Sequence, residues 1–178
     1  MKLSILICSL ASRVEYLAKL LSILSPQLID GVEIIVLIDD GKQKIGVKRN
    51  RLMASATGQY ICFIDDDDEV SDDYIAHVMI GIGAGVDHIA VGGIMTTNGR
   101  ESHEFRSSKD YEWHEKEGIY YRGVQHLGVL RRALALQCPF PPISFGEDRK
   151  FSEAITPLIR TEYQVRKPIY FYHYRNLK

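Results

Sequence analysis

The 178-residue sequence has neither an excess of one charge nor a long apolar segment. Its 22 Lys and Arg residues are matched by 23 Asp and Glu residues, so no overall basic field favours nucleic acid as a partner. The longest apolar region, residues 77–95, is interrupted by Asp87, His88 and several glycines, so no transmembrane segment is expected. The apolar N-terminus is too short for a signal peptide and predicts a first strand.

Cysteine is also scarce, and the three cysteines show no pairing pattern. Cys8, Cys62 and Cys138 are widely spaced and odd in number, and two of them lie in apolar, strand-like segments. This favours reduced thiols in the core over disulfides or a zinc site. A cytoplasmic protein is therefore expected, with peripheral attachment to a membrane left open.

The most informative stretch is Tyr60–Asp68, in which a short strand-like segment runs into four consecutive aspartates. Neighbouring carboxylates ~4 Å apart repel one another by ~1 kcal/mol in water and ~4 kcal/mol near a protein surface. Such a cluster either spreads into solvent or binds a cation, and oxygen ligands suit Mg²⁺ or Mn²⁺. A solvated acidic turn is the alternative to a metal-held phosphate.

The hydrophobic pattern of the first 95 residues alternates between strands and helices. Strands are predicted at residues 3–8, 32–38, 60–64 and 88–91, and amphipathic helices at residues 13–24, 46–56 and 71–82. This order predicts an α/β fold with a mostly parallel, doubly wound sheet and helices on both faces.

Polar residues follow three of these strands, namely Ser9, Asp39–Asp40 and Asp65–Asp68. Ligands of doubly wound sheets bind outside the carboxyl ends of the strands, where these side chains are expected to converge. The convergence favours a functional acid cluster over a solvated turn.

The second half of the chain has a weaker pattern. Residues 96–117 are polar without a sustained period and predict a long loop, whereas residues 126–137 have leucines at helical spacing. A helix is expected to open at FGEDRKF, Phe145–Phe151, and a strand near residues 168–175. The chain is short enough to form one domain over residues 1–178.

Taken together, these motifs resemble glycosyltransferase family 2, whose members have the GT-A fold and transfer a sugar from a nucleotide-sugar with inversion. The resemblance rests on VEIIVLIDDG, on the block KRNRLMASATGQYICFIDDDD with its D-x-D motif, and on the later Glu147–Asp148 pair. It implies a UDP-sugar donor, a bound Mn²⁺ or Mg²⁺, and a saccharide, lipid-linked or protein acceptor. It also implies a nucleotide-sugar-binding half at residues 1–95 and an acceptor-side half at residues 96–178.

The family's functional positions carry over to individual residues of this chain. Asp148 matches the catalytic base, and the implied metal ligands are Asp67 and Asp65, completed by His173. His173 as a buried, hydrogen-bonded histidine is the alternative. The implied donor-binding residues are Ser9, Arg13, Asp39, Asp40, Lys48, Asn50, Asp65 and Asp66.

The chain departs from the family pattern at two places near the nucleotide. The opening turn reads Ser9-Leu10-Ala11-Ser12 in place of Pro-Thr-Tyr-Asn, and Lys42 follows Asp-Asp-Gly in place of serine. These departures keep open a non-catalytic module that binds nucleotide or a divalent ion. A sugar nucleotidyltransferase is disfavoured, because no glycine-rich phosphate loop follows the first strand.

Overall fold

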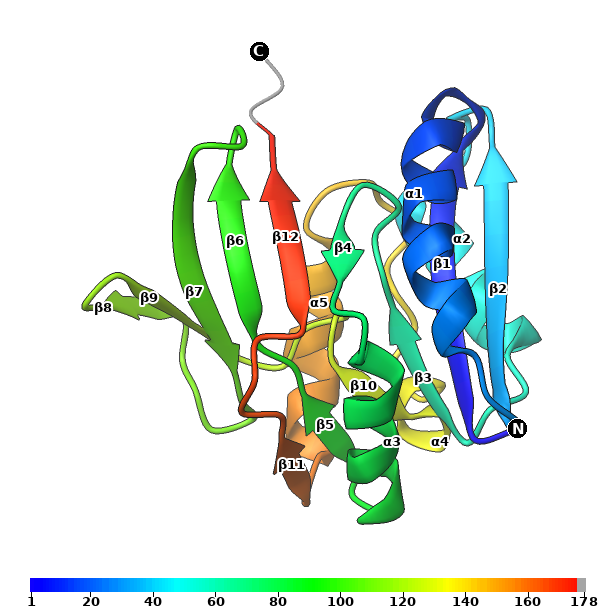
Figure 1. Ribbon diagram of the computed structural model, residues 1–178. Helices are drawn as coiled ribbons and strands as arrows, with labels where there is room; N and C mark the ends of the chain where they lie inside the picture. The colour runs from blue at the N-terminus through cyan, green and yellow to red at the C-terminus, as the bar shows by residue number, and fades with distance from the viewer. Residues whose placement is uncertain (176–178) are drawn as a thin grey trace.

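The computed structural model of the chain describes residues 1–175 and consists of two six-stranded sheets with helices around the first (Figure 1). The first sheet has the order β11-β5-β10-β3-β1-β2. Its strands are β1 (Leu3–Leu10), β2 (Val32–Asp39), β3 (Tyr60–Phe63), β5 (His88–Ala90), β10 (Val129–Arg131) and β11 (Glu162–Gln164).

The first sheet is mostly parallel, as the sequence predicts. Strand β1 pairs in parallel with β2 and β3, and β5 pairs in parallel with β11, whereas β10 runs antiparallel to both β3 and β5. Successive side chains of a strand point to opposite faces of the sheet. In β1, Leu3, Ile5 and Ile7 therefore lie in one core, and Leu6 and Cys8 lie in another. The sheet is therefore buried on both faces at its centre.

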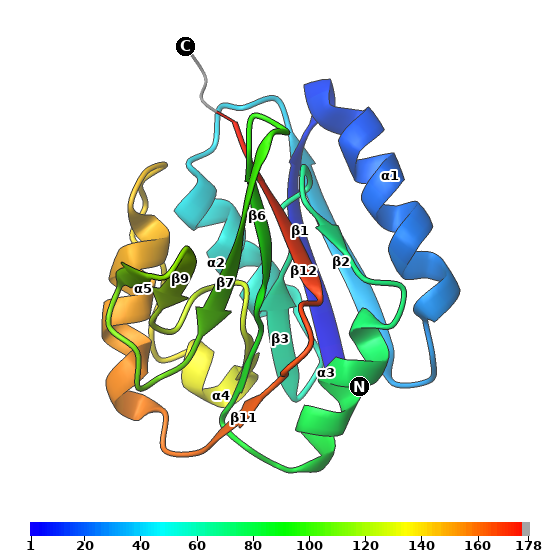
Figure 2. The same cartoon turned by 60° about the vertical axis from the view of Figure 1, so that its left-hand side comes forward.

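Helices cover both faces of this sheet, with α1 and α3 on one side and α2, α4 and α5 on the other (Figures 1 and 2). Three short 3₁₀ turns, η1 (Ala11–Arg13), η2 (Ser25–Gln27) and η3 (Thr156–Leu158), extend or follow these helices. The α-helices are α1 (Val14–Leu24), α2 (Ile45–Ser55), α3 (Tyr74–Gly83), α4 (Arg132–Ala135) and α5 (Glu147–Ile155).

The second sheet, with the order β4-β12-β6-β7-β9-β8, packs against the α1 and α3 side of the first. Phe105 and Tyr170 from this sheet share a core with Tyr74 and Ile75 of α3. Its strands are β4 (Glu69–Val70), β6 (Gly93–Thr97), β7 (Glu101–Ser107), β8 (His114–Lys116), β9 (Ile119–Arg122) and β12 (Tyr170–Tyr174).

The structure corrects two sequence predictions. The predicted loop at residues 96–117 is wrong, because it contains the end of β6 together with β7 and β8. The predicted helix at residues 126–137 is also wrong over its first half, where Val129–Arg131 forms β10 and only Arg132–Ala135 is helical. In both places the strands are short or exposed, so they show too few alternating residues to reveal a period of two.

The prediction of reduced cysteines in the core agrees with the structure. Cys8, Cys62 and Cys138 are free and buried. Within residues 1–175, no helix is both long and apolar enough to cross a membrane.

Glu162 of β11 ties the two sheets together. Its buried carboxylate contacts His88 Nδ1 at 2.8 Å and accepts hydrogen bonds from Ser108 Oγ and the Lys109 amide, each at 2.7 Å. Burial alone would raise the pKa of Glu162, but the hydrogen bonds from His88, Ser108 and Lys109 outweigh it and lower the pKa to about 2.

We expect Glu162→Gln to lower the free energy of unfolding by about 2 kcal/mol at pH 7, because hydrogen bonds to a buried charge are stronger than those to an amide. The folded-state pKa of about 2 lies below the ordinary value of 4.5, so the carboxylate stabilises the fold above pH 4.5. This advantage should disappear as the pH falls towards about 2. Urea unfolding of both proteins across this range measures the difference, and the exposed Glu153→Gln serves as control; a pH-independent difference would contradict the assignment.

Candidate active site

A cavity of about 420 Å³ opens at the carboxyl ends of β1, β2 and β3, where the sequence predicts the ligand site. It is bounded by the ends of the three strands, the start of α2 and the start of α5. Its charged and polar lining residues are Ser9, Arg13, Gln43, Lys48, Arg49, Asp65, Asp66, Asp67, Ser144 and Glu147. Segments distant in the sequence therefore meet at one edge of the first sheet.

Asp66 and Asp67 lie between cations from the two ends of the chain. Ser9 Oγ donates to Asp66 Oδ2 at 2.7 Å, and Arg13 NH1 reaches Asp66 Oδ1 at 3.1 Å and Asp67 Oδ2 at 3.4 Å. Arg175, just after β12, reaches Asp67 Oδ2 at 2.9 Å. Burial and the charges of Asp65 and Asp66 raise the pKa of Asp67 despite Arg13. Negative charge at this edge is therefore only partly neutralised.

Lys48 and Asp39 form a second, buried ion pair in the wall of the cavity. Lys48 Nζ lies 2.6 Å from Asp39 Oδ1 and also donates to the Ser9 carbonyl at 3.3 Å. The hydrogen bond from Lys48 lowers the pKa of Asp39, and the Gln43 amide binds its other oxygen at 3.1 Å. Helix α2 thus fixes the end of β2 beside the end of β1.

Arg49 connects the acid cluster to α5. Its guanidinium lies 3.1 Å from Asp65 Oδ1 and 2.8 Å from Glu147 Oε1, and its central carbon lies 5.6 Å from the Phe63 ring centroid and 5.4 Å from that of Phe140. Burial alone would raise the pKa of Asp65, but the nearby His126 and Arg49 lower it below its usual range. His126 and Arg49 therefore favour the ionised form of Asp65.

His126 links the same cluster to the predicted catalytic base. Its Nε2 lies 3.3 Å from Asp65 Oδ2, and its Nδ1 lies 4.0 Å from Asp148 Oδ2. The Asp148 side chain is 42% exposed, whereas the His126 side chain is 9% exposed. The carboxylate of Asp148 is thus accessible from solvent on one side, and on the other side it lies next to the buried imidazole of His126.

Asp68 points away from the cavity and supports the second sheet. It accepts hydrogen bonds from Tyr170 Oη at 2.8 Å and from the His173 amide at 2.8 Å. Burial and the charge of Asp65 raise the pKa of Asp68 to about 8. The fourth aspartate therefore anchors β12 to the turn that follows β3.

Besides Asp39 and Asp148, whose partners line this cavity or lie next to it, three of the residues singled out in the sequence lie outside it. Asn50 exchanges two hydrogen bonds of 2.8 Å with the backbone of Phe140, and exposed Asp40 pairs with Lys42. His173 faces Thr96 Oγ1 at 3.0 Å and Glu69 Oε1 at 3.1 Å. Its ring therefore belongs to the strand surface, and the structure does not bring it together with Asp65 and Asp67.

Two residues of the network, Arg49 and His126, were not among those predicted from the sequence. Arg49 was visible only as one of several cations in a helix, and His126 was assigned to a helix that does not form there. Their partners are 98 and 61 residues away in the chain, for the Arg49–Glu147 and His126–Asp65 contacts respectively. No local spacing signals such pairs.

The donor set at this edge fits a magnesium-like ion. In the described part of the chain, no three His, Cys, Asp or Glu side chains form a group that could enclose a metal. Mg²⁺ usually binds through one or two protein carboxylates and fills its other positions with water and phosphate oxygens. Asp67 and Asp65, both lining the cavity, provide carboxylates of that kind.

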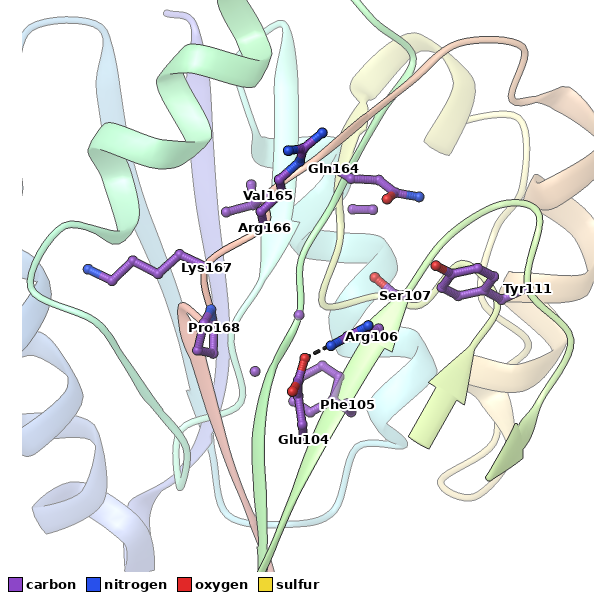
Figure 3. Close-up of a pocket in the computed structure, with 13 residues that line it drawn as sticks. Glu104, Phe105, Arg106, Ser107, Tyr111, Gln164, Val165, Arg166, Lys167 and Pro168 are labelled. Atoms are coloured by element: carbon purple, nitrogen blue, oxygen red, sulfur yellow. Dashed lines mark hydrogen bonds and ion pairs between the residues drawn. The ribbon is translucent and has the colours of Figure 1, made fainter. Parts of the chain in front are cut away.

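A second cavity of about 300 Å³ lies between β7 and the segment Gln164–Pro168 (Figure 3). Arg106 and Glu104 pair with each other at its edge, at 2.6 Å. None of the residues predicted from the sequence lines it. The second cavity is therefore separate from the residues that the sequence singles out.

Comparison with known proteins agrees with this architecture. The sequence model of the family described as Glycosyl transferase family 2 matches residues 18–135. No curated protein matches the sequence.

Solved structures share the fold at low sequence identity. Residues 1–349 of S. aureus TarS in complex with UDP-GlcNAc superimpose with a TM-score of 0.76 at 16% identity, covering 100% of this chain and 60% of that chain. The A197 protein from STIV superimposes with a TM-score of 0.51 at 16% identity, covering 93% of this chain and 82% of that one. The present chain therefore spans about 60% of the length of TarS residues 1–349. The superposition confirms the GT-A, Rossmann-like fold.

We expect Arg49→Met to lower the free energy of unfolding by ~3–5 kcal/mol, because it leaves the carboxylates of Glu147 and Asp65 without their shared cation. Arg51→Met, an exposed arginine of the same helix bonded to Gln43, should change it by less than ~0.5 kcal/mol. Chemical denaturation followed by circular dichroism measures both values. Equal effects of the two substitutions would show that the buried network contributes nothing particular to stability.

Proposed function

The chain belongs to glycosyl transferase family 2, and on that premise we propose that it is an inverting, divalent-metal-dependent glycosyltransferase. Its donor is a nucleotide-sugar, with UDP as the nucleotide, and its acceptor is a hydroxyl group. The observation that carries the proposal is the spatial arrangement of acids. Asp65–Asp67 line a cavity with Arg13, Lys48 and Arg49, while Asp148 stands beside them across His126.

The cavity has the charges that a nucleoside diphosphate requires. Arg13 and Lys48 are cations at the mouth and wall of the site, and guanidinium groups bind phosphate oxygens through paired N–H donors. Asp39 and Asp66 are fixed carboxylates that accept hydrogen bonds from ribose or base. The complex of S. aureus TarS with UDP-GlcNAc, which shares this fold, supports a UDP-sugar as the donor.

Residues Asp67 and Asp65 would hold a Mn²⁺ or Mg²⁺ ion, which when bound supplies Lewis-acid stabilisation of the departing diphosphate. The residues of the chain prepare this position in two ways. Arg49 and His126 favour the ionised form of Asp65. Around Asp67, the negative charges of the neighbouring aspartates are only partly offset by Arg13 and Arg175. His173 lies away from these two carboxylates and is not required by the proposal.

Asp148 is the group proposed to remove the proton from the acceptor hydroxyl. Attack on the anomeric carbon from the side opposite the diphosphate inverts its configuration, so a single base on that side suffices. The exposed carboxylate of Asp148 meets this requirement, and His126 restricts its orientation. Residues 1–95 would then form the donor half and residues 96–178 the acceptor side.

We expect Asp67→Ala to remove the Mn²⁺-dependent part of nucleotide binding. UDP with Mn²⁺ at ~100 times its dissociation constant should stabilise the wild-type protein by ~2.7 kcal/mol, visible as a higher midpoint of thermal unfolding. In Asp67→Ala, this shift should fall to the level seen with UDP alone. The exposed Asp110→Ala is the control, and the absence of any shift in the wild type with UDP, GDP, CDP or TDP would overturn the donor site.

We expect Asp148→Asn to preserve that thermal shift while reducing turnover by at least ~100-fold, the usual contribution of a positioned base. Release of UDP from a UDP-sugar with Mn²⁺ measures turnover, with water as the acceptor when no other is known. Full turnover by Asp148→Asn would show that another group takes the proton. Nucleotide binding without turnover in the wild-type protein would instead favour the non-catalytic module.

A further inference from the structure

Strand β2 is a long strand at an open edge of the first sheet. The order β11-β5-β10-β3-β1-β2 places it last, and within residues 1–175 it pairs with β1 alone (Figure 1). Each residue of β2, from Val32 to Asp39, lies opposite one residue of β1, so the strand is regular and has no bulge. One full side of its backbone is therefore open to a further strand.

The other three edge strands that the structure describes are much shorter. β8 and β11 have three residues each, and β4 has two. β8 is also fully exposed and has the sequence His-Glu-Lys, with charged side chains. Short or charged edges pair poorly with another chain. β2 is thus the edge of the described structure that is best suited to bind a further strand.

β2 also lacks the residues that usually protect an open edge. Its sequence, VEIIVLID, contains no lysine, arginine or proline. Glu33 accepts hydrogen bonds from Ser4 Oγ at 2.6 Å and from Thr57 Oγ1 at 2.7 Å. Asp39 is held by Lys48 Nζ at 2.6 Å. Both carboxylates of the strand are therefore engaged within the chain, and neither presents a free charge to an approaching strand.

The hydrogen bonds of β1 show which residues of β2 face outward. The Leu6 carbonyl accepts from the Ile64 amide at 3.2 Å, on the side of β3. The Leu3 amide donates to the Gly31 carbonyl at 3.1 Å, on the side of β2. Because a residue in a parallel pair bonds to the two neighbours of the residue opposite, the odd-numbered residues of β2 face β1 and the even-numbered ones face outward. The outward residues beyond Val32 are Ile34, Val36 and Ile38.

The side chains of β2 leave both cores open at this edge. Ile34 and Val36 pack on the core that contains α1 and α3, and both are only partly buried. Ile35 and Leu37 pack on the core that contains α2 and α5, and they are also only partly buried. Ile38 is 52% exposed. A strand beside β2 would therefore cover apolar surface on both faces of the sheet.

A second copy of β2 fits these outward groups. Ile34 and Ile38 lie two residues before and after Val36. An antiparallel copy related by a two-fold axis at Val36 therefore sets Ile34 of each copy opposite Ile38 of the other, and every outward N–H of these residues faces a C=O. Glu33 falls opposite Asp39 of the other copy, and the partners that already hold these carboxylates limit their repulsion. The arrangement is closed, because it uses the open edge of both copies.

We propose that the chain forms a two-fold symmetric dimer in which β2 pairs antiparallel with β2 of a second copy, so that the first sheets of both copies become one continuous sheet. Because the strands are antiparallel, the two donor cavities open towards opposite edges of the joined sheet. Ile34, Val36 and Ile38 do not line the donor cavity. The dimer is therefore independent of the glycosyltransferase activity proposed above.

Sedimentation velocity of the full chain over a wide range of concentrations tests the dimer. A reversible equilibrium between monomer and dimer is expected. Ile38→Lys places a charge on the shared edge and should raise the dissociation constant of the dimer by at least ~10-fold. Ile80→Lys changes an isoleucine of similar exposure, 57%, on α3 and should leave the dissociation constant unchanged.

A wild-type chain that is monomeric at every concentration, or equal dimerisation by Ile38→Lys and the wild type, would overturn the proposal. Circular dichroism checks folding. If Ile38→Lys is unfolded, Ile38→Pro takes its place, because it removes an outward N–H and no bond to β1. Unchanged dimerisation by Ile38→Pro would also overturn the proposal.

Single cysteine substitutions test the position of the two-fold axis. Val36→Cys should form a disulfide between copies under mild oxidation, because opposed hydrogen-bonded residues have Cα atoms ~5.5 Å apart. Ile38→Cys is more exposed, but its Cα should lie ~14 Å from its counterpart, so no disulfide is expected. The wild type, whose three cysteines are buried, serves as the blank. Cross-linking of Ile38→Cys as strong as that of Val36→Cys would contradict the proposed pairing.

Discussion

The buried guanidinium of Arg49 fixes the geometry on which the active site depends. Removing a charge from water costs several kcal/mol unless opposite charges and hydrogen bonds surround it. Arg49 therefore requires Asp65, at the end of β3, and Glu147, at the start of α5, within about 3 Å. Because Asp148 follows Glu147 directly, this one requirement also sets the proposed base beside the acid cluster. The position of Asp148 thus follows from an ion pair in which it takes no part.

The four consecutive aspartates show how identical residues acquire different roles from their surroundings. Asp65 is ionised by Arg49 and His126, and Asp66 is bound by Ser9 and Arg13. The raised pKa of Asp68, about 8, reflects burial against Tyr170 and β12. Asp67 remains as the carboxylate whose charge is shared by two cations at the cavity's edge.

The sequence was sufficient for β1, β2, β3 and β5 of the first sheet and for the edge at which their polar residues meet, but not for β10 and β11. The segments that became β1, β2 and β3 are apolar and regularly spaced, and the rule that ligands bind at the carboxyl ends of parallel strands brought together Ser9, Asp39 and Asp65. The second sheet was missed because β8 is a three-residue, fully exposed strand and β7 carries mostly polar side chains. The sheet also depends on the pairing of β6 with β12, in which Gly93 lies opposite Tyr170, and local patterns do not encode a contact so distant in the chain.

The position of a residue within a family motif predicts its place in the fold. It is a poorer guide to the contacts that the side chain makes. Asn50 stands in the expected helix, yet its amide is fully used by the Phe140 backbone. His173 stands in the expected strand, but it lies between Tyr172 and Tyr174, and alternation turns its ring away from the acids that Tyr172 faces. One residue of register therefore decides which side chains of the second sheet face the acid cluster.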